Sequence, residues 1–216
     1  MKMPSVVLFV ALASTFFLKS GHAEVSVADV ALLTVVQGEV SFQGKDGKAR
    51  PVVAYMRIRH GDTIRLQKRS IMRLTYTTVP RQEIWTGPGS FVVTLAGGEV
   101  ISGPKPVVVP LPANVPQRLA RVSELMATSH MGGSVVRSVK APIPASKEDI
   151  AAAMSVYESM RANTSITDVT PELYLYSIFL DNEMYDDLKI VAKDMLIRQP
   201  DNTEIRQLAK ATLTVP

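Results

Sequence analysis

The stretch SGPKPVVVPLPANVP, residues 102–116, decides how the chain is organised. Five of its residues are proline, and proline removes a backbone donor and clashes with the preceding turn, so no helix can run through it. Before it, from Val30, apolar residues come in short alternating runs divided by turn residues. After it, they recur at the three- and four-residue spacing of helices. We therefore predict an α+β chain with a β half, an extended connector and a helical half.

The β half, residues 24–103, contains seven or eight short strand candidates separated by turn signals. Gly61-Asp62 is typical of these signals, since Gly allows a positive φ and Asp bonds nearby backbone. The alternative for this pair is a cation or sugar ligand in an exposed turn. The spacing of the strands predicts an antiparallel β roll, barrel or sandwich.

Several motifs in this half follow one another in a characteristic order. They are Val36-Gln37-Gly38-Glu39-Val40, Arg59-His60-Gly61-Asp62-Thr63-Ile64, Ser70-Ile71-Met72-Arg73-Leu74 and Trp85-Thr86-Gly87-Pro88-Gly89-Ser90-Phe91. Over about Val30 to Ile101 this order resembles the FecR-type periplasmic domain. The resemblance implies a module for binding or signal relay, which in founding members passes an occupancy signal from an outer-membrane transporter to a sigma factor.

The second half begins with a connector, residues 104–145, in which one helix is predicted at about 117–129. Residues 146–216 are predicted to be helical, with Ser146 and Asp149 as a capping box and Thr170 as the N-cap before Pro171. Residues 174–204 resemble one tetratricopeptide repeat, because Tyr185, Ala192 and Pro200 hold the places of its aromatic, small and terminating residues. The resemblance implies a small helical hairpin that contacts protein.

The first 23 residues have the three parts of a secretory signal: Lys2, an apolar run from Val6 to Leu18, and small residues around a cut after Ala23. We expect a periplasmic or secreted mature chain with no membrane span, since no later stretch is apolar for about 20 residues. The chain has no Cys, which excludes disulfides and thiolate metal sites.

Charge is divided unevenly along the mature chain. Residues 24–140 carry 15 Lys and Arg against 8 Asp and Glu, a net of +7, whereas residues 141–216 carry 7 against 12, a net of −5. Opposite signs indicate two modules, or two faces that attract each other.

Two groups of side chains are candidates for binding. The first is a basic strand face with a neighbouring indole, made of Arg57, Arg59, Arg65, Arg73 and Trp85. It is either a solvated outer face or a cationic surface for an anionic glycan, lipopolysaccharide or the acidic half of this chain, with Trp85 in the core or stacking on sugar. The second is Tyr174, Tyr176 and Tyr185, which either line a peptide groove or pack in the helical core.

Catalytic patterns were not found, since the chain has three His, no Cys and no Gly-x-Ser-x-Gly. We expect no enzyme activity, no cofactor, no metal and no nucleic-acid ligand. The prediction is a non-enzymatic exported binding, scaffold or signal-relay protein of the cell envelope with a protein partner. The alternative is a protein that binds anionic cell-wall glycan through the basic face.

Overall fold

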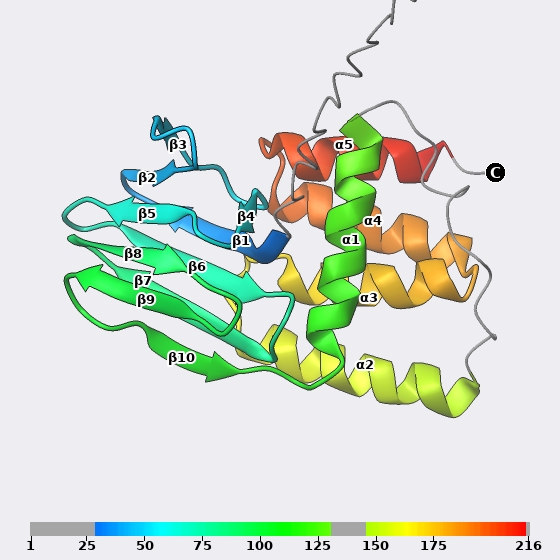
Figure 1. Ribbon diagram of the computed structural model, residues 1–216. Helices are drawn as coiled ribbons and strands as arrows, with labels where there is room; N and C mark the ends of the chain where they lie inside the picture. The colour runs from blue at the N-terminus through cyan, green and yellow to red at the C-terminus, as the bar shows by residue number, and fades with distance from the viewer. Residues whose placement is uncertain (1–28, 131–145, 215–216) are drawn as a thin grey trace, which may run out of the picture.

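The computed structural model describes residues 29–130 and 146–214 (Figure 1). These residues form two antiparallel sheets of five strands and five helices, which confirms the predicted α+β class. The predicted signal segment and residues 131–145 of the predicted connector lie outside the described residues.

The β part is a sandwich of two sheets, with strand orders β10-β7-β6-β1-β4 and β3-β2-β5-β8-β9. Its apolar core contains side chains from both sheets, among them Leu33, Met72 and Trp85 from the first and Ile64 and Phe91 from the second. We call these the first and the second sheet. The strands are β1 (Asp29–Gln37), β2 (Val40–Gln43), β3 (Ala49–Pro51), β4 (Arg57–Arg59), β5 (Thr63–Leu66), β6 (Ile71–Tyr76), β7 (Arg81–Thr86), β8 (Gly89–Val93), β9 (Gly98–Ser102) and β10 (Val107–Pro110).

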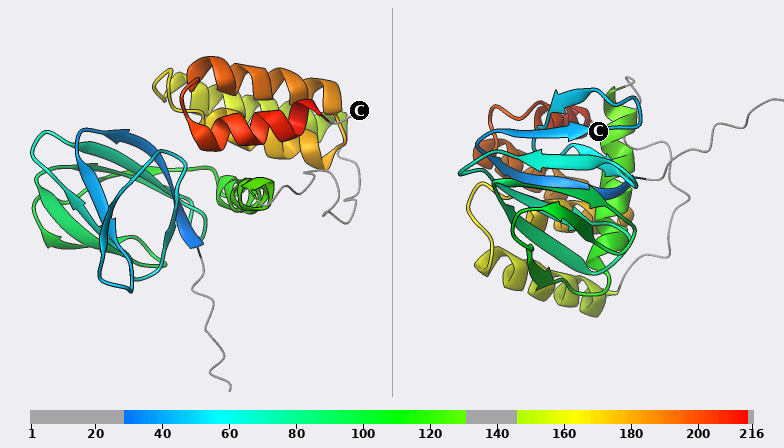
Figure 2. Two further views of the ribbon diagram at one scale, coloured as in Figure 1. Left: turned by 90° about the horizontal axis from the view of Figure 1, so that it is seen from above. Right: turned by 60° about the vertical axis from the view of Figure 1, so that its left-hand side comes forward.

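The helices pack around α3, in which every residue is buried. α3 contacts α1, α2 and α4, while α5 packs against α4 and α1. α1 runs across the other helices, as Figure 1 shows, and in Figure 2 it lies beside both the β part and the other helices. The helices are α1 (Val115–His130), α2 (Lys147–Ala162), α3 (Thr170–Asp181), α4 (Tyr185–Arg198) and α5 (Thr203–Leu213).

The two parts share a buried boundary. Leu32 and Tyr55 of the β part belong to the same apolar core as the helices. The Tyr55 hydroxyl accepts a hydrogen bond from the Val169 N–H at 2.9 Å, just before α3. Nearby, the Asn202 side chain donates to the Ala54 carbonyl at 3.2 Å. The β part and the helices are therefore one packed body.

Two predicted boundaries differ from the structure. The sheet does not end at residue 103, because β10 pairs with β7 from Val107↔Ile84 to Pro110↔Arg81. Proline is tolerated there since β10 is an edge strand. The apolar run from Pro51 to Tyr55 also favours a strand, but only Pro51 lies in one: Tyr55 has φ 67°, and the chain turns there between β3 and β4.

The predicted N-cap is confirmed for α2 and is wrong for α3. The capping box of Ser146 and Asp149 is confirmed, and the hydrogen bonds from Ser146 hold the pKa of Asp149 below its usual value. Thr170 is not the N-cap but the first residue of α3. The N-cap is Val169, which makes no side-chain cap hydrogen bond, and the N–H and hydroxyl of Thr170 both donate to the Asp168 carboxylate.

Candidate functional site

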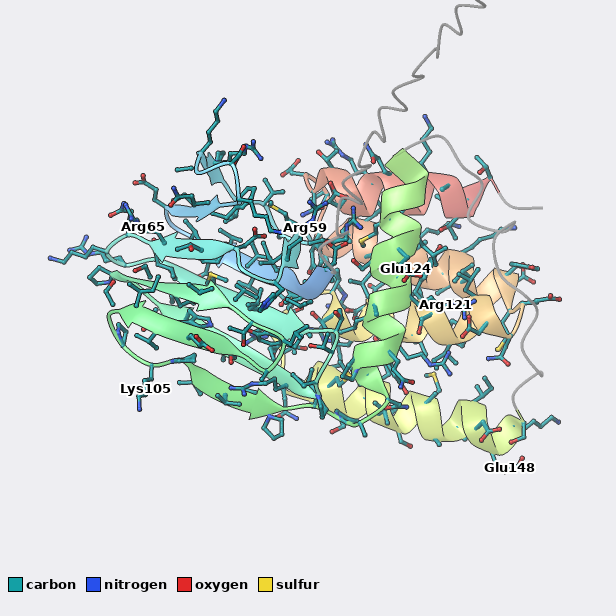
Figure 3. The ribbon with its side chains drawn as sticks, in the orientation of Figure 1. Arg59, Arg65, Lys105, Arg121, Glu124 and Glu148 are labelled. Carbon is teal, nitrogen blue, oxygen red and sulfur yellow. The ribbon has the colours of Figure 1, made fainter. Side chains whose placement is uncertain are left out.

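The four arginines and the tryptophan of the predicted binding face do not share one surface. Arg57 and Arg59 lie on β4 at the edge of the first sheet, and both form ion pairs with Asp29, at 2.6 and 3.3 Å. Arg59 lies near the helices in Figure 3, whereas Arg65 lies toward the far end of the β part. The strand that carries Arg57 and Arg59 therefore presents a partly neutralised edge.

Arg73 faces the helical part of the same chain. Its guanidinium donates to Asp168 at 2.6 Å, and the Asp168 side chain is fully buried while that of Arg73 is 18% exposed. The sequence allowed several acidic partners for this arginine, and in the structure its partner belongs to the acidic half of the same chain. Arg73 thus joins β6 to the start of α3.

Trp85 is a core residue, 2% exposed. Its ring stacks on Phe91 with centroids 3.6 Å apart, and its indole N–H donates to the Glu83 carboxylate at 3.0 Å. A buried indole with its donor satisfied has no free face for a sugar. The sugar-stacking alternative for Trp85 is therefore wrong.

Glu83 anchors the polar centre of the sandwich and was missed by sequence reasoning. It is 0% exposed, and besides the indole it accepts from the Tyr76 hydroxyl at 3.2 Å, from the Gly98 N–H and from Arg81 at 2.7 Å. Burial and the carboxylate raise the pKa of Tyr76, because both disfavour the phenolate. Four donors satisfy this buried carboxylate, so its arrangement is structural.

Gly61 and Asp62 close the turn between β4 and β5. Gly61 has φ 89°, and Asp62 accepts the Arg59 N–H at 2.9 Å, three residues back. Burial raises the pKa of Asp62 above its usual value. This hydrogen bond from the backbone to Asp62 is the kind of turn contact that was predicted for the pair.

The tyrosines that were candidates for lining a peptide groove pack in the helical core instead. Tyr174 and Tyr176 are both 0% exposed. The Tyr174 hydroxyl accepts from Asn114, just before α1, at 3.1 Å, and the Tyr176 hydroxyl lies 2.7 Å from that of Thr212 in α5. Burial raises the pKa of Tyr176 to about 12. Both rings are therefore core residues, as helical spacing allowed, and Tyr185 is partly buried against the same core.

α1 covers this side of the helical array through a stripe of apolar residues and two arginines. Arg118 and Arg121 both pair with Asp181, the last residue of α3, whose side chain is 8% exposed. A carboxylate at a helix C-terminus is unfavourable by itself, because that end carries a partial negative charge. The arginines of α1, with Arg121 visible in Figure 3, offset this charge. The stripe consists of Val115, Leu119, Val122, Leu125 and Met126.

The outer side of α4 has the most exposed apolar side chains of the described helices. Ile190 is 63% and Ile197 is 78% exposed, and Ile166, in the loop before α3, is 73% exposed. Arg198 donates to the Ile166 carbonyl at 3.2 Å, so this loop lies beside the end of α4. The sequence signal was the seven-residue spacing of Ile190 and Ile197, off the buried stripe of α4 at Leu188 and Met195.

Within residues 29–130 and 146–214, no helix combines the length and the apolar character needed to cross a bilayer. The same described residues contain no group of three or more His, Asp and Glu placed to hold a metal ion. No family model, curated protein or solved structure matches the chain.

Proposed function

We propose that this chain is a non-enzymatic exported protein of the cell envelope that binds a protein partner through the outer side of α4. Export is supported by the signal-like first 23 residues. The order of motifs in the β part, which resembles FecR-type domains, and the resemblance of residues 174–204 to a tetratricopeptide repeat support a binding, scaffold or relay role.

The observation that carries the proposal is the pair of exposed isoleucines on α4. Exposed single apolar residues are common, but Ile190 and Ile197 are about two helical turns apart on one stripe of α4, and the loop of Ile166 lies beside the end of that helix, so one partner could cover all three. The stripe is surrounded by charged residues of both signs, namely Lys189, Lys193, Asp186 and Asp194. An apolar centre with a charged rim is the composition of protein interfaces.

The tyrosines do not carry the proposal, because Tyr174 and Tyr176 are buried. A glycan bound across Arg57, Arg59 and Arg73 is not supported, since these three arginines are ion-paired within the chain.

The test is a pull-down from an envelope fraction with the whole mature chain as bait, since the two parts share a core and are not separate units. The variant Ile190→Lys with Ile197→Lys places two charges at the centre of the stripe. We expect it to lose a partner that the unmodified chain retains.

The matched control adds the same two charges on α2, as Ala151→Lys with Ser155→Lys, at positions that are also exposed and helical. It should retain the partner. Recovery of the same proteins by both variants, or of none by the unmodified chain, would show that the outer side of α4 is not a binding surface.

A further inference from the structure

Four exposed basic residues, none with an ion pair among the described residues, lie at the end of the β part that points away from the helices (Figure 3). Four turns meet there: residues 37–39, 67–70, 87–88 and 103–106. The Gln67 N–H donates to the Glu39 carbonyl at 3.0 Å, and the Gly87 N–H to the Ser70 carbonyl at 2.8 Å. A side chain on Gly103 would lie 2.5 Å from the Pro88 carbonyl oxygen, so the last two turns are in contact too.

These turns and the adjoining strand β5 carry four cations, which we call the distal patch: Arg65, Lys68, Arg69 and Lys105. All four are exposed, and Figure 3 shows Arg65 and Lys105 at the same end of the sandwich. The four turns contain one acidic residue, Glu39. The distal patch therefore keeps a net positive charge, unlike the paired arginines of the first sheet.

Arg65 is also the centre of a row of hydroxyl groups on the outer face of the second sheet. Ser41 of β2 and Ser90 of β8 lie opposite it, and Ser90 lies opposite Ser102 of β9, with the two hydroxyls 2.8 Å apart. Their strand neighbours Ile64, Leu66 and Phe91 point into the core, so the row points outward. Since adjacent strands are about 4.8 Å apart, Ser41 and Ser102 are about 14 Å apart.

One cation of the patch is held in a backbone conformation that does not suit it. Arg69 has φ 67°, in the left-handed region where Gly or Asn is favoured and other residues cost about 1–2 kcal/mol. The turn alone would select Asn. Unlike Tyr55, which has the same φ and is buried, Arg69 is exposed, so its side chain is a candidate for a role outside the fold.

We propose that the distal patch and the row of Ser41, Arg65, Ser90 and Ser102 bind an anionic glycan chain. The cations attract carboxylate or phosphate groups on the sugar, and the flat row of hydroxyls hydrogen-bonds with sugar hydroxyls between them. Nucleic acid fits less well, because among the described residues no aromatic side chain is exposed beside the patch for base stacking and Trp85 is buried. This second site is at the opposite end from α4 and does not rest on the proposed protein partner.

The test measures binding of the mature chain to immobilised polygalacturonate between about 50 and 200 mM salt. Each neutralised cation contributes about 0.7 to the slope of log affinity against log salt. Lys68→Gln with Arg69→Asn should therefore lower the slope by about 1.4 and weaken binding by about fivefold per charge. Its matched control, Lys147→Gln on α2 with Lys210→Gln on α5, removes the same net charge at two exposed positions and should bind unchanged.

Two further variants separate this role from misfolding and from general attraction to polyanions. Arg69→Asn alone should weaken binding while the melting temperature stays equal or rises, because Asn tolerates the left-handed turn. Ser41→Ala with Ser90→Ala should weaken binding to polygalacturonate and leave binding to polyphosphate unchanged. Equal loss in the control with Lys147→Gln and Lys210→Gln, or no salt-dependent binding to polygalacturonate, would overturn the proposal. Stronger binding to single-stranded DNA or to phosphatidylglycerol vesicles would overturn it as well.

Discussion

Replacing Tyr55 by Phe removes one oxygen atom and tests whether the β part and the helices unfold as one unit. Tyr55 is 1% exposed, and its hydroxyl is the acceptor for the buried Val169 N–H at 2.9 Å. The substitution keeps the ring and leaves that donor without its partner. An unsatisfied buried donor costs about 1–3 kcal/mol, which corresponds to a melting temperature lower by about 2–12 °C for a chain of this size.

The assay follows urea unfolding with two signals that come from different parts. The only Trp of the chain, Trp85, reports on the sandwich core through its fluorescence, and circular dichroism reports on the helices. Because Leu32 and Tyr55 belong to the helical core, we expect both midpoints to fall together. Tyr185→Phe is the matched control: Tyr185 is only partly buried, and the change should stay within about 0.5 kcal/mol.

A lower helical midpoint with an unchanged Trp85 midpoint would refute the reasoning, since it would mean that the two parts unfold separately. An unchanged stability in both signals would refute it differently, by showing that the Val169 N–H finds another acceptor. In either case the boundary at Tyr55 would not hold the two parts together.

Three other perturbations have expected outcomes. Arg121→Gln leaves Asp181 with one arginine at the end of α3; chemical denaturation should show a loss of about 1–3 kcal/mol, and a loss below about 0.5 would contradict it. Glu83→Gln deprives Arg81 of a charged partner and should lower the melting temperature and shift Trp85 fluorescence; an unchanged spectrum would count against the indole contact. Burial raises the pKa of Tyr176 to about 12 in the folded chain, against about 10 in the unfolded chain, so the free energy of unfolding should fall as pH rises above about 10. The fall should be less steep in Tyr176→Phe, and equal steepness would contradict this.

Much of the architecture followed from local patterns. The proline stretch separated strands from helices, and the capping box at Ser146 marked the start of α2 to the residue. Such features depend on neighbours in sequence, which a single chain displays. The sequence favours Thr170 as the N-cap of α3, whereas the N-cap is Val169; an apolar N-cap has no sequence signal, and a carboxylate one residue before it is equally compatible with a loop.

The binding residues were harder to predict, because their roles depend on partners distant in sequence. Arg73 and Asp168 are 95 residues apart, and nothing near either residue indicates that they meet. Arg57, Arg65 and Arg73 look alike in sequence, yet two of them are paired and one is exposed on the other sheet. The alternation of apolar and polar residues along a strand indicates which side chains point away from the core, but it does not indicate which other residues they meet there.

The opposite charges of the two halves now have a physical explanation. Arg73 of the basic half meets Asp168, and Arg118 and Arg121 meet Asp181, so cations before residue 140 neutralise buried carboxylates of the helical half. An ion pair with a buried carboxylate is costly to break, because the remaining charge stays in a low-dielectric setting. The attraction is therefore used within the chain, between β6 and the start of α3 and between α1 and the end of α3. The exposed cations of the distal patch have no such partner among the described residues and are accessible to a ligand from outside the chain.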